Sequence, residues 1–421
     1  MKILVLSYEY PPIGGGGGVI CKNISENLAG LGHEVIVMTT DFHEIPNSIR
    51  QLADQIPNKT QTQNSKIQNS IQHSTFNIQH LKLIRLPARR ERAYESNPLE
   101  MLSWIREAKR YIRTHPGFVD FDVCMAHFVL PGGEVARWLK KKYGLPYVLV
   151  SHGHDIPWVH PRQMFFYHLG AYGWIKNICR QSSLNFIQTS MMKENIDRFL
   201  GKKYEGKNTI IPNGVDTSNF YPDHSKRPEH LRILFIGRLV IQKDPMTFLN
   251  AVRLFSKETH DFEVRILGDG HLRKKMERYV IKNGLAGNVK FCGKIPEEQM
   301  LQEYQAAHLM VAPSLNEGMS ISALEALSCG IYLIATRASG FEDMITENVN
   351  GELVNFRDPQ SIYQKLKNFS GMTERGNTVP QKYLRQIPEI YSWEAISCQY
   401  SNLMYTIIVS HSPERRSRSL E

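Results

Sequence analysis

Two cations follow an apolar segment in the second half of the chain, where they could bind an anionic ligand. Arg238 comes directly after the run "RILFIG", and Lys243 stands five residues later. The planar guanidinium of an arginine and the ammonium group of a lysine, placed together at the end of one strand, can bind a diphosphate. In isolation such a pair is more often two solvated surface charges, but a segment with two glutamates further along the chain favours the anion site.

That segment is "VAPSLNEGMSISALEALSCG". A strand is expected to end at Ala312, and the loop after it leads into a helix from about Ser320 to Ser328. Glu317 then lies in the loop and Glu325 in the second helical turn, too far apart to share one proton. The spacing predicts that they contact different parts of one extended ligand, with a phosphate at the helix N-terminus between them.

Five consecutive glycines, Gly14–Gly18, follow the first apolar run "MKILVLS" and open a helical stretch. The dinucleotide fingerprint G-x-G-x-x-G fails by register, because its sixth position falls on Val19 or Ile20, and no Gly-Lys-Ser/Thr follows for a P-loop. Asp41 could still imitate the ribose-binding acid of a dehydrogenase, which stays an alternative. The favoured interpretation is a loop whose free N–H groups meet an anion or a sugar, and the plainer one is a flexible turn.

Strand-like runs alternate with helical stretches along the chain, which predicts an α/β protein with parallel sheets. Seven such runs precede the polar stretch "YPDHSKRPEH" and six follow it, so we expect two doubly wound domains. Ligands of such sheets bind beyond the carboxyl ends of the strands. The expected divisions are 1–215 and 216–392 for the domains, 43–80 for an Asn/Gln-rich insertion in the first, and 411–421 for a disordered tail.

Composition limits the partners and the compartment. A formal net charge of +10 over 421 residues favours an anionic partner, such as nucleotide phosphates, nucleic acid or an acidic membrane face. The six cysteines form no Cys-x-x-Cys pair, which is typical of a reducing compartment. No signal-peptide core or membrane-spanning run is found. We therefore expect a cytoplasmic protein.

Two groups of possible metal ligands are interpreted as structural. Asp120-Phe121-Asp122 spells the D-x-D of metal-dependent transferases, but it precedes a strand, and three-residue matches are common. The second group lacks the i, i+4 spacing of helical ligand pairs and consists of His152, His154, Asp155 and His160. No metal site is predicted.

A basic segment from Lys82 to Arg113 holds nine Lys or Arg residues against four Glu. A solvated helix face is the plainer interpretation. Peripheral contact with an anionic membrane is the alternative, since the same segment also offers the apolar side chains Leu99, Leu102, Trp104 and Ile105.

The motifs in order resemble the retaining glycosyltransferases of the GT-B architecture, family four, also called glycosyl transferases group 1. "GRLVIQKDP", "EVRILGDGHLR", "VKFCGKIPEEQM", "APSLNEGMSISALEALSCG" and "ASGFEDMI" resemble the donor half, and "YEYPPIGGGGG", "FDVCMAHFVLPGG" and "SHGHDI" the acceptor half. The resemblance implies two facing Rossmann-like domains with a deep interdomain cleft. It also implies a nucleotide-diphosphate sugar held mostly by the second domain, and a helix at 393–410 that crosses back to the first.

The resemblance assigns roles to matching positions. Arg238 and Lys243 would grip the diphosphate, Glu325 would hydrogen-bond the ribose, and the catalytic set would be completed by Glu317 and His152 beside the donor sugar. The implied donor-binding residues are Gly15, Gly16, Arg238, Lys243, Lys294, Ile295, Glu317, Gly318, Met319, Ser320, Ile321 and Glu325. Two departures concern acceptor choice: Met319 stands where phenylalanine is usual, and five glycines exceed the usual two or three.

The resemblance implies transfer of a sugar, a hexose by preference, to a hydroxyl acceptor: a polysaccharide, a lipid-linked molecule or a small molecule. Arg238, Lys243 and a helix N-terminus would stabilise the leaving diphosphate without a metal or other cofactor. Same-face attack with the leaving phosphate as base is favoured over double displacement, because nothing marks Glu317 as a nucleophile. An epimerase or hydrolase of the same architecture is the runner-up, a noncatalytic binding module is the third class, and nucleic acid is not an expected partner.

Overall fold

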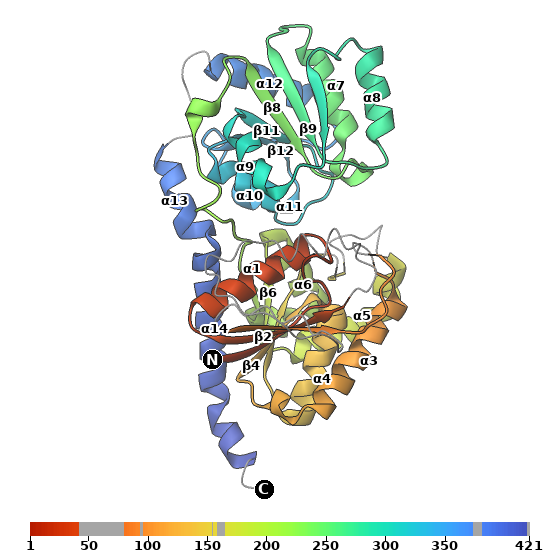
Figure 1. The fold of residues 1–421 in the computed structure, drawn as a ribbon, viewed down its shortest axis with the longest axis vertical. Coiled ribbons are helices and arrows are strands. Elements are labelled where there is room, and N and C mark those ends of the chain that lie inside the picture. Colours follow the sequence, from red (N-terminus) through yellow and green to blue (C-terminus); the bar gives the residue numbers. More distant parts are fainter. Residues whose placement is uncertain (42–79, 93–95, 154, 158–164, 374–380, 419–421) are drawn as a thin grey trace, which may run out of the picture. The chain divides into compact units, whose positions relative to one another are not determined.

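The computed structural model describes residues 1–41, 80–92, 96–153, 155–157, 165–373 and 381–418. The expected insertion at 43–80, apart from His80, lies outside the described residues, as do His154 and His160. The chain divides into two compact units (Figure 1). Unit 1 comprises Met1–Ile187, Met192–Ile211 and Ser397–Glu421, and unit 2 comprises Gln188–Met191 and Pro212–Ile396.

The described part of unit 1 contains a sheet of seven parallel strands in the order β3-β2-β1-β4-β5-β6-β7. Each strand coincides with a strand-like run of the sequence, so that prediction is confirmed. The strands are β1 (Lys2–Leu6), β2 (Glu34–Thr40), β3 (Leu81–Leu86), β4 (Val123–His127), β5 (Tyr147–Val150), β6 (Leu184–Ile187) and β7 (Asn208–Ile210). The helices are α1 (Gly16–Gly30), α3 (Pro98–Thr114), α4 (Glu134–Tyr143), α5 (Phe165–Gln181) and α6 (Ser190–Leu200).

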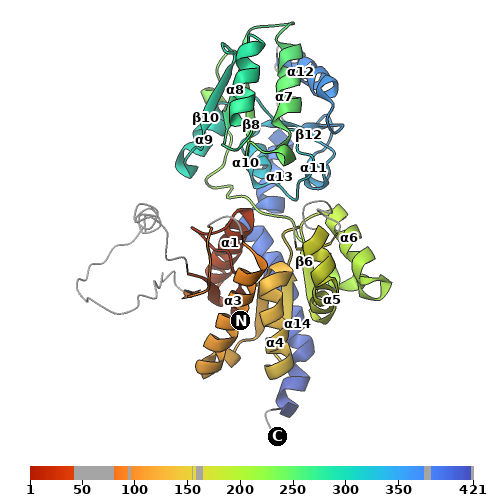
Figure 2. The same ribbon diagram turned by 90° about the vertical axis from the view of Figure 1, so that its right-hand side faces the viewer.

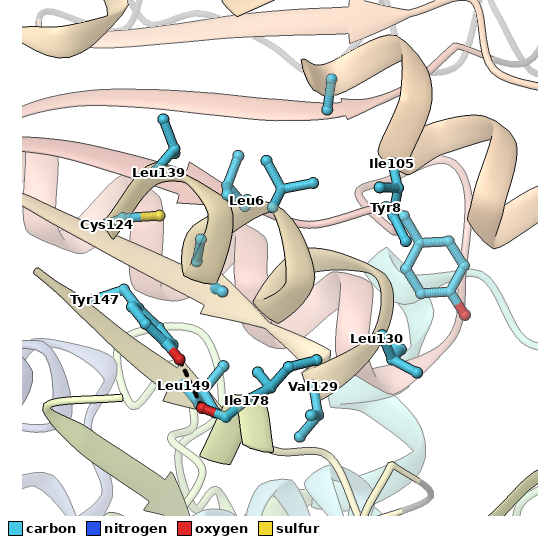
Figure 3. Close-up of a cluster of buried hydrophobic side chains, with 14 of the residues drawn as sticks. Leu6, Tyr8, Ile105, Cys124, Val129, Leu130, Leu139, Tyr147, Leu149 and Ile178 are labelled. Carbon is cyan, nitrogen blue, oxygen red and sulfur yellow. Dashed lines mark hydrogen bonds between the residues drawn. The ribbon is translucent and has the colours of Figure 1, made fainter. Parts of the chain in front are cut away.

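The two faces of this sheet have separate cores, because successive strand side chains point to opposite sides. Leu4 and Leu6 of β1 pack in a cluster with side chains of α3, α4, α5 and α6. Figure 3 shows part of this cluster, where the buried Tyr147 hydroxyl donates a hydrogen bond of 2.6 Å to the carbonyl of Ile178. The burial of α3 corrects one interpretation: Trp104 and Ile105 belong to this core and are only 1% and 7% exposed.

The other face of the sheet is covered by α1 and by α14 (Trp393–Arg418). Tyr400 of α14 packs edge-on against Phe186 of β6, with ring centroids 4.9 Å apart, and Ser401 Oγ lies 2.7 Å from His33 Nε2. In Figure 2, α14 lies on the opposite side of this sheet from α3 and α4. A sheet that buries both faces in this way explains its near-continuous apolar strands.

α14 supplies residues to both units, since Trp393 to Ile396 belong to unit 2 and Ser397 onward to unit 1. In unit 2, a Cβ at Gly214 would lie 2.5 Å from the Trp393 ring, so only glycine fits under that indole. The helix continues to Arg418, past the expected end at residue 410. The prediction of a disordered tail from 411 was therefore wrong up to that point. The Glu and Arg residues of this segment favour a helix.

Unit 2 is built around six parallel strands, in the order β10-β9-β8-β11-β12-β13 among its described residues, and all six were predicted. They are β8 (Leu231–Ile236), β9 (Phe262–Leu267), β10 (Val289–Gly293), β11 (Leu309–Ala312), β12 (Tyr332–Thr336) and β13 (Gly351–Val354). One face packs against α7 (Pro245–Phe255), α8 (Arg273–Lys282) and α12 (Pro359–Thr373). The other packs against α9 (Glu297–Gln305), α10 (Ile321–Ser328), α11 (Ser339–Met344) and α13 (Gln381–Tyr391).

Candidate functional site

In unit 2, the loops after β8 and β11 bring together a predicted cation and a predicted carboxylate. Lys243 Nζ forms a short ion pair with Glu317 Oε2, and both side chains are mostly buried. Gln242 ties the two loops: its carbonyl accepts a 2.8 Å hydrogen bond from Leu315 N, and its amide donates to the Asn316 carbonyl at 3.0 Å. The loops therefore present one positive and one negative group as a preassembled pair.

Arg238 lies on the same loop as Lys243 but points its charge to solvent. Its side chain is exposed, and no described residue bonds to its guanidinium. The preceding Gly237 has a φ of +142°, and a Cβ at the facing Gly268 would lie 2.0 Å from the Gly237 carbonyl oxygen. Gly237 and Gly268 thus let the ends of β8 and β9 approach each other closely. The exposed guanidinium of Arg238 is available for a ligand.

The start of α10 lies directly after Glu317. Ser320 caps the helix by accepting a hydrogen bond from Ala323 N at 3.4 Å. Gly318 is pressed against Gly340, where a Cβ would come within 1.8 Å of the Gly318 carbonyl oxygen. Met319 is buried, and its carbonyl accepts a 2.9 Å hydrogen bond from Asn213 Nδ2. The Met319 side chain therefore packs in the core, while the N–H groups at the start of α10 keep the dipole that favours an anion.

Glu325 lies in the second turn of α10, as predicted, and has a different partner from Glu317. The hydroxyl of the fully buried Tyr304 donates to Glu325 Oε2 at 2.7 Å. Burial raises the pKa of Glu325 to about 7, although the Tyr304 hydrogen bond lowers it. A carboxyl group poised near neutral pH, with one oxygen engaged, has its other oxygen available for a hydroxyl donor.

Two further predicted residues follow β10. Gly293 has a φ of +71°, which turns the chain out of the sheet. Lys294 is exposed, and Ile295 packs on the core of α9 and α10. Their backbone stands at the strand edge where the resemblance places the base of a nucleotide.

In unit 1, the five glycines serve distinct purposes. Gly14 has a φ of +94°, and a Cβ at Gly17 would lie 2.5 Å from the Phe128 ring and 3.4 Å from His152 Cγ. At Gly18 a Cβ would come within 3.0 Å of the Ile13 carbonyl oxygen. A Cβ at Gly15 or Gly16 would meet no described atom within 4 Å. Packing therefore explains three glycines, and Gly15 and Gly16 are the two left open to a ligand.

Glu9 is a residue that sequence reasoning missed. Its Oε2 accepts a 3.3 Å hydrogen bond from Gly15 N, and its Oε1 lies 3.7 Å from the guanidinium of Arg90. The Arg90 side chain is 1% exposed, so it is not part of the basic surface expected for its segment. Burial raises the pKa of Glu9 above its ordinary value, against the opposing charge of Arg90. A carboxylate therefore already holds one N–H of the glycine loop.

His152 follows β5 and faces a second histidine that the sequence analysis did not single out. His127, the last residue of β4, is fully buried, and its Nδ1 lies 3.1 Å from His152 Nε2. Asp155 holds the two loops together by accepting hydrogen bonds from Val129 N at 2.9 Å and from His152 N at 3.0 Å. The pair joins the strand ends of β4 and β5, a proximity that only the parallel pairing of these strands provides.

The candidate metal ligands that the sequence analysis discounted have other partners. Asp122 accepts a 2.8 Å hydrogen bond from Lys2 N, and Asp120 one of 3.1 Å from Lys2 Nζ. Among the described residues, no three His, Cys, Asp or Glu side chains are grouped as metal ligands would be.

Two family models match consecutive parts of the chain. "Glycosyltransferase Family 4" matches residues 14–219, and "Glycosyl transferases group 1" matches residues 216–377. An uncharacterized glycosyltransferase of Methanocaldococcus jannaschii is 24% identical, covering 94% of this chain and 95% of that protein. A D-inositol 3-phosphate glycosyltransferase of Corynebacterium urealyticum is 23% identical, covering 96% and 95%.

Solved structures resemble the chain over nearly its whole length. Sucrose-phosphate synthase from Thermosynechococcus elongatus has a TM-score of 0.76 at 18% identity, covering 97% of this chain and 100% of that one. The Anabaena protein HepE in complex with UDP-glucose has a TM-score of 0.70 at 16% identity, covering 96% and 100%. The fold of two α/β units, each built on a parallel sheet, is thus shared with these proteins.

Proposed function

The chain belongs to the glycosyl transferases group 1 and has their GT-B fold, and from this we propose a retaining, metal-independent transfer of a hexose to a hydroxyl acceptor. It is a glycosyltransferase of the nucleotide-sugar type. The observation that carries the proposal is the pairing of Lys243 with Glu317 beside the exposed Arg238 and the start of α10.

We propose that unit 2 holds the donor. Cleavage of the bond between the sugar and the diphosphate builds negative charge on the phosphate oxygens. Arg238 and Lys243 supply two positive charges, and the N-terminus of α10 adds a positive helix dipole. Glu317 orients Lys243 and is placed to accept a hydroxyl of the sugar. Glu325 accepts the ribose hydroxyls with the oxygen that Tyr304 leaves free.

The acceptor hydroxyl attacks on the face from which the diphosphate leaves, and a phosphate oxygen takes its proton. This route fits Glu317, because a carboxylate that is ion-paired with Lys243 is a poor nucleophile. A nucleotide-sugar panel screened by thermal shift should first identify the donor, since binding to the folded state raises the melting temperature.

Transfer should proceed with retention and should be unchanged in excess EDTA, because Arg238, Lys243 and the helix dipole already supply positive charge to the leaving group. The measurement is the anomeric configuration of the product by NMR, with rates compared with and without EDTA. An inverted product, or activity that needs Mg²⁺ or Mn²⁺, would contradict the proposal.

We further propose that the acceptor is lipid-linked, as in polysaccharide assembly, and that a cytoplasmic protein meets it at the inner face of the cell membrane. Within the described ranges, no helix combines the length and apolar character needed to cross a membrane. The support is one side of α3: Leu99 and Leu102 are 68% and 48% exposed, and Arg106 and Arg110, also exposed, follow at helical spacing. Two leucines beside arginines suit the surface of an anionic leaflet.

Binding to vesicles should therefore rise with the fraction of anionic lipid and fall with salt, because each Arg near the surface contributes about 1 kcal/mol. Replacing Arg89, Arg106 and Arg110 by Glu should abolish cosedimentation with anionic vesicles. Arg90 is left intact, because it is buried against Glu9.

A matched control replaces three exposed cations of α8, Lys274, Lys275 and Arg278, by Glu. The control changes net charge equally, so its binding should stay close to that of the unaltered protein. Equal loss in both triple variants would mean that only net charge matters and would argue against a surface centred on α3. Equal recovery of the protein in the supernatant with neutral and anionic vesicles at low salt would contradict membrane binding altogether.

A further inference from the structure

A carboxylate from the preceding loop holds the start of α1. The first N–H groups of any helix lack an acceptor within the helix, and the helix dipole gives them a preference for negative charge. Glu9 Oε2 accepts a 3.3 Å hydrogen bond from Gly15 N, and Gly15 is the N-cap residue of α1. Among the described residues, none accepts a hydrogen bond from Gly16 N or Gly17 N. Glu9 therefore takes one N–H of the glycine loop and leaves the next two.

The Glu9 side chain lies directly against the glycines. A Cβ at Gly14 would lie 2.6 Å from Glu9 Oε2 and 2.7 Å from Glu9 Cβ, so a side chain there would displace the carboxylate. The Glu9 backbone is fixed as well, because the hydroxyl of the buried Ser7 donates a 2.6 Å hydrogen bond to the Glu9 carbonyl. The absence of a side chain at Gly14 thus gives Glu9 its access to Gly15 N.

Arg90 holds the carboxylate from the other side. Its guanidinium lies 3.7 Å from Glu9 Oε1, and the side chains of Arg90 and Glu9 are 1% and 12% exposed. Two further contacts set its position: Arg90 Nε donates to the Arg92 carbonyl at 2.9 Å, and Arg90 Cζ lies 5.0 Å from the centre of the Tyr8 ring. Burial raises the pKa of Glu9, whereas the Arg90 charge acts against that rise and favours the carboxylate. The two charges are therefore buried as a pair, and removing one of them is costly.

We propose that Glu9 is a positioning residue of the transfer reaction, which fixes Gly15 N so that Gly16 N and Gly17 N are presented to the nucleotide sugar. The inference rests on the proposed function and on the role that the resemblance assigns to Gly15 and Gly16. It divides these two open glycines: the N–H of Gly15 is used within the loop, and that of Gly16 binds substrate. Arg90 acts one step further away, because it holds the carboxylate that holds the loop.

The physical advantage of the pair is preorganisation. Glycines lose more backbone entropy on ordering than other residues, so a loop of five is costly to fix at the moment of binding. In the folded protein, Glu9 and Arg90 fix this loop before any substrate arrives, which lowers the cost of binding. Without Glu9 that cost falls on the bound ground state and on the transition state alike. The expected signature is a raised KM with little change in kcat.

The hydrogen bond can be measured on the unaltered protein by amide hydrogen exchange in samples labelled with ¹⁵N-glycine. Spectra of Gly15→Ala and Gly16→Ala assign the two signals. We expect the Gly15 amide to exchange about tenfold more slowly than the Gly16 amide, because only Gly15 N has an acceptor. Glu9→Ala should remove this difference, and Glu9→Gln should keep it, since the amide oxygen of glutamine can accept the same hydrogen bond. Equal exchange of the two amides in the unaltered protein would overturn the inference.

Kinetics test the role in the reaction, with the nucleotide sugar that is selected by thermal shift. Glu9→Ala should raise its KM about tenfold and keep kcat within about threefold, whereas Glu9→Gln should stay within about threefold in both. Arg90→Met should also raise KM, and adding Glu9→Gln should restore part of the loss, because both charges are then absent. Glu91→Ala is the matched control: it breaks an exposed pair with Arg89 in the same segment and should leave KM unchanged.

The outcomes separate this inference from the proposed function. Lower melting temperatures and lower kcat in Glu9→Ala, with KM unchanged, would mean a merely structural role and would overturn it. Loss of slow exchange in Glu9→Ala with an unchanged KM, in a protein where Gly16→Ala is also without effect, would refute binding of the nucleotide sugar by this loop. Absence of sugar transfer by the unaltered protein would contradict the proposed function, and the exchange rates would still decide whether Glu9 fixes the loop.

Discussion

Replacing Lys243 by methionine is expected to lower kcat/KM about ten- to a hundredfold. Methionine keeps much of the length of the stem and removes the charge that would stabilise the departing diphosphate, and such a charge-assisted hydrogen bond contributes about 1.5–3 kcal/mol. Steady-state kinetics with the donor selected by thermal shift measure the loss. Lys275→Met, on the exposed side of α8, is the matched control and should leave kcat/KM unchanged.

The ion pair makes this test sharper. Lys243→Met leaves the Glu317 carboxylate mostly buried without its cation, whereas the double variant with Glu317→Gln removes both charges. The combined loss should therefore be smaller than the sum of the single losses, by about 0.5–3 kcal/mol, as is found for residues in contact. Arg238→Ala, whose guanidinium has no partner among the described residues, should lose activity without such coupling to Glu317. Strict additivity of Lys243 and Glu317 would mean that the pair does not act as a unit.

Replacing Glu325 by glutamine should weaken donor binding about ten- to a hundredfold, because hydroxyl groups bound to a carboxylate lose a charged acceptor. The pKa of Glu325 near 7 adds a pH dependence. Below pH 7 the group becomes protonated, so donor affinity of the unaltered protein should fall as pH drops from 8 to 6. Tyr304→Phe removes the hydrogen bond that lowers this pKa and should move the fall to higher pH.

Glu325→Gln should also stabilise the unliganded protein at pH values near and above 7. A carboxyl whose pKa is raised by folding contributes stability that is present below its unfolded pKa and is lost as pH rises through the folded one. Between about pH 4.5 and 7 the unaltered protein should lose up to about 3 kcal/mol on this account, and Glu325→Gln should not. Denaturant titrations at pH 6 and 8 measure the difference. Equal pH slopes, with donor affinity independent of pH, would show that Glu325 is ionised throughout.

The sheets and the backbone of the candidate site were predictable because their signals are local. Apolar runs bounded by Gly, Pro and Asn marked every strand, and Glu317 and Glu325 could be assigned to a loop and a helix from their spacing alone. The strand ends of parallel sheets then placed the site loops at one edge. The pairing of Lys243 with Glu317 needed only the further fact that β8 and β11 are neighbours.

The misses concern contacts between residues far apart in sequence. Arg90 was counted as a surface cation because nothing in its segment points to Glu9, 81 positions earlier. Trp104 was assigned to a basic face, although α3 turns it into the core. His127 ends a strand of small and apolar residues, and only the pairing of β4 with β5 brings it to His152. Buried polar partners of this kind leave no periodic pattern in a sequence.

The course of α14 affects how the protein is made. Unit 1 needs the helix residues from Ser397 onward, yet residues 212–396 belong to unit 2 and leave the ribosome first. At about 5–20 residues per second, the 185 residues between take roughly 10–40 s to synthesise. During that interval the sheet face around Phe186 lacks the cover of Tyr400. The nascent chain therefore carries an incomplete first unit. Until α14 emerges, the exposed sheet face is a surface that chaperones can bind.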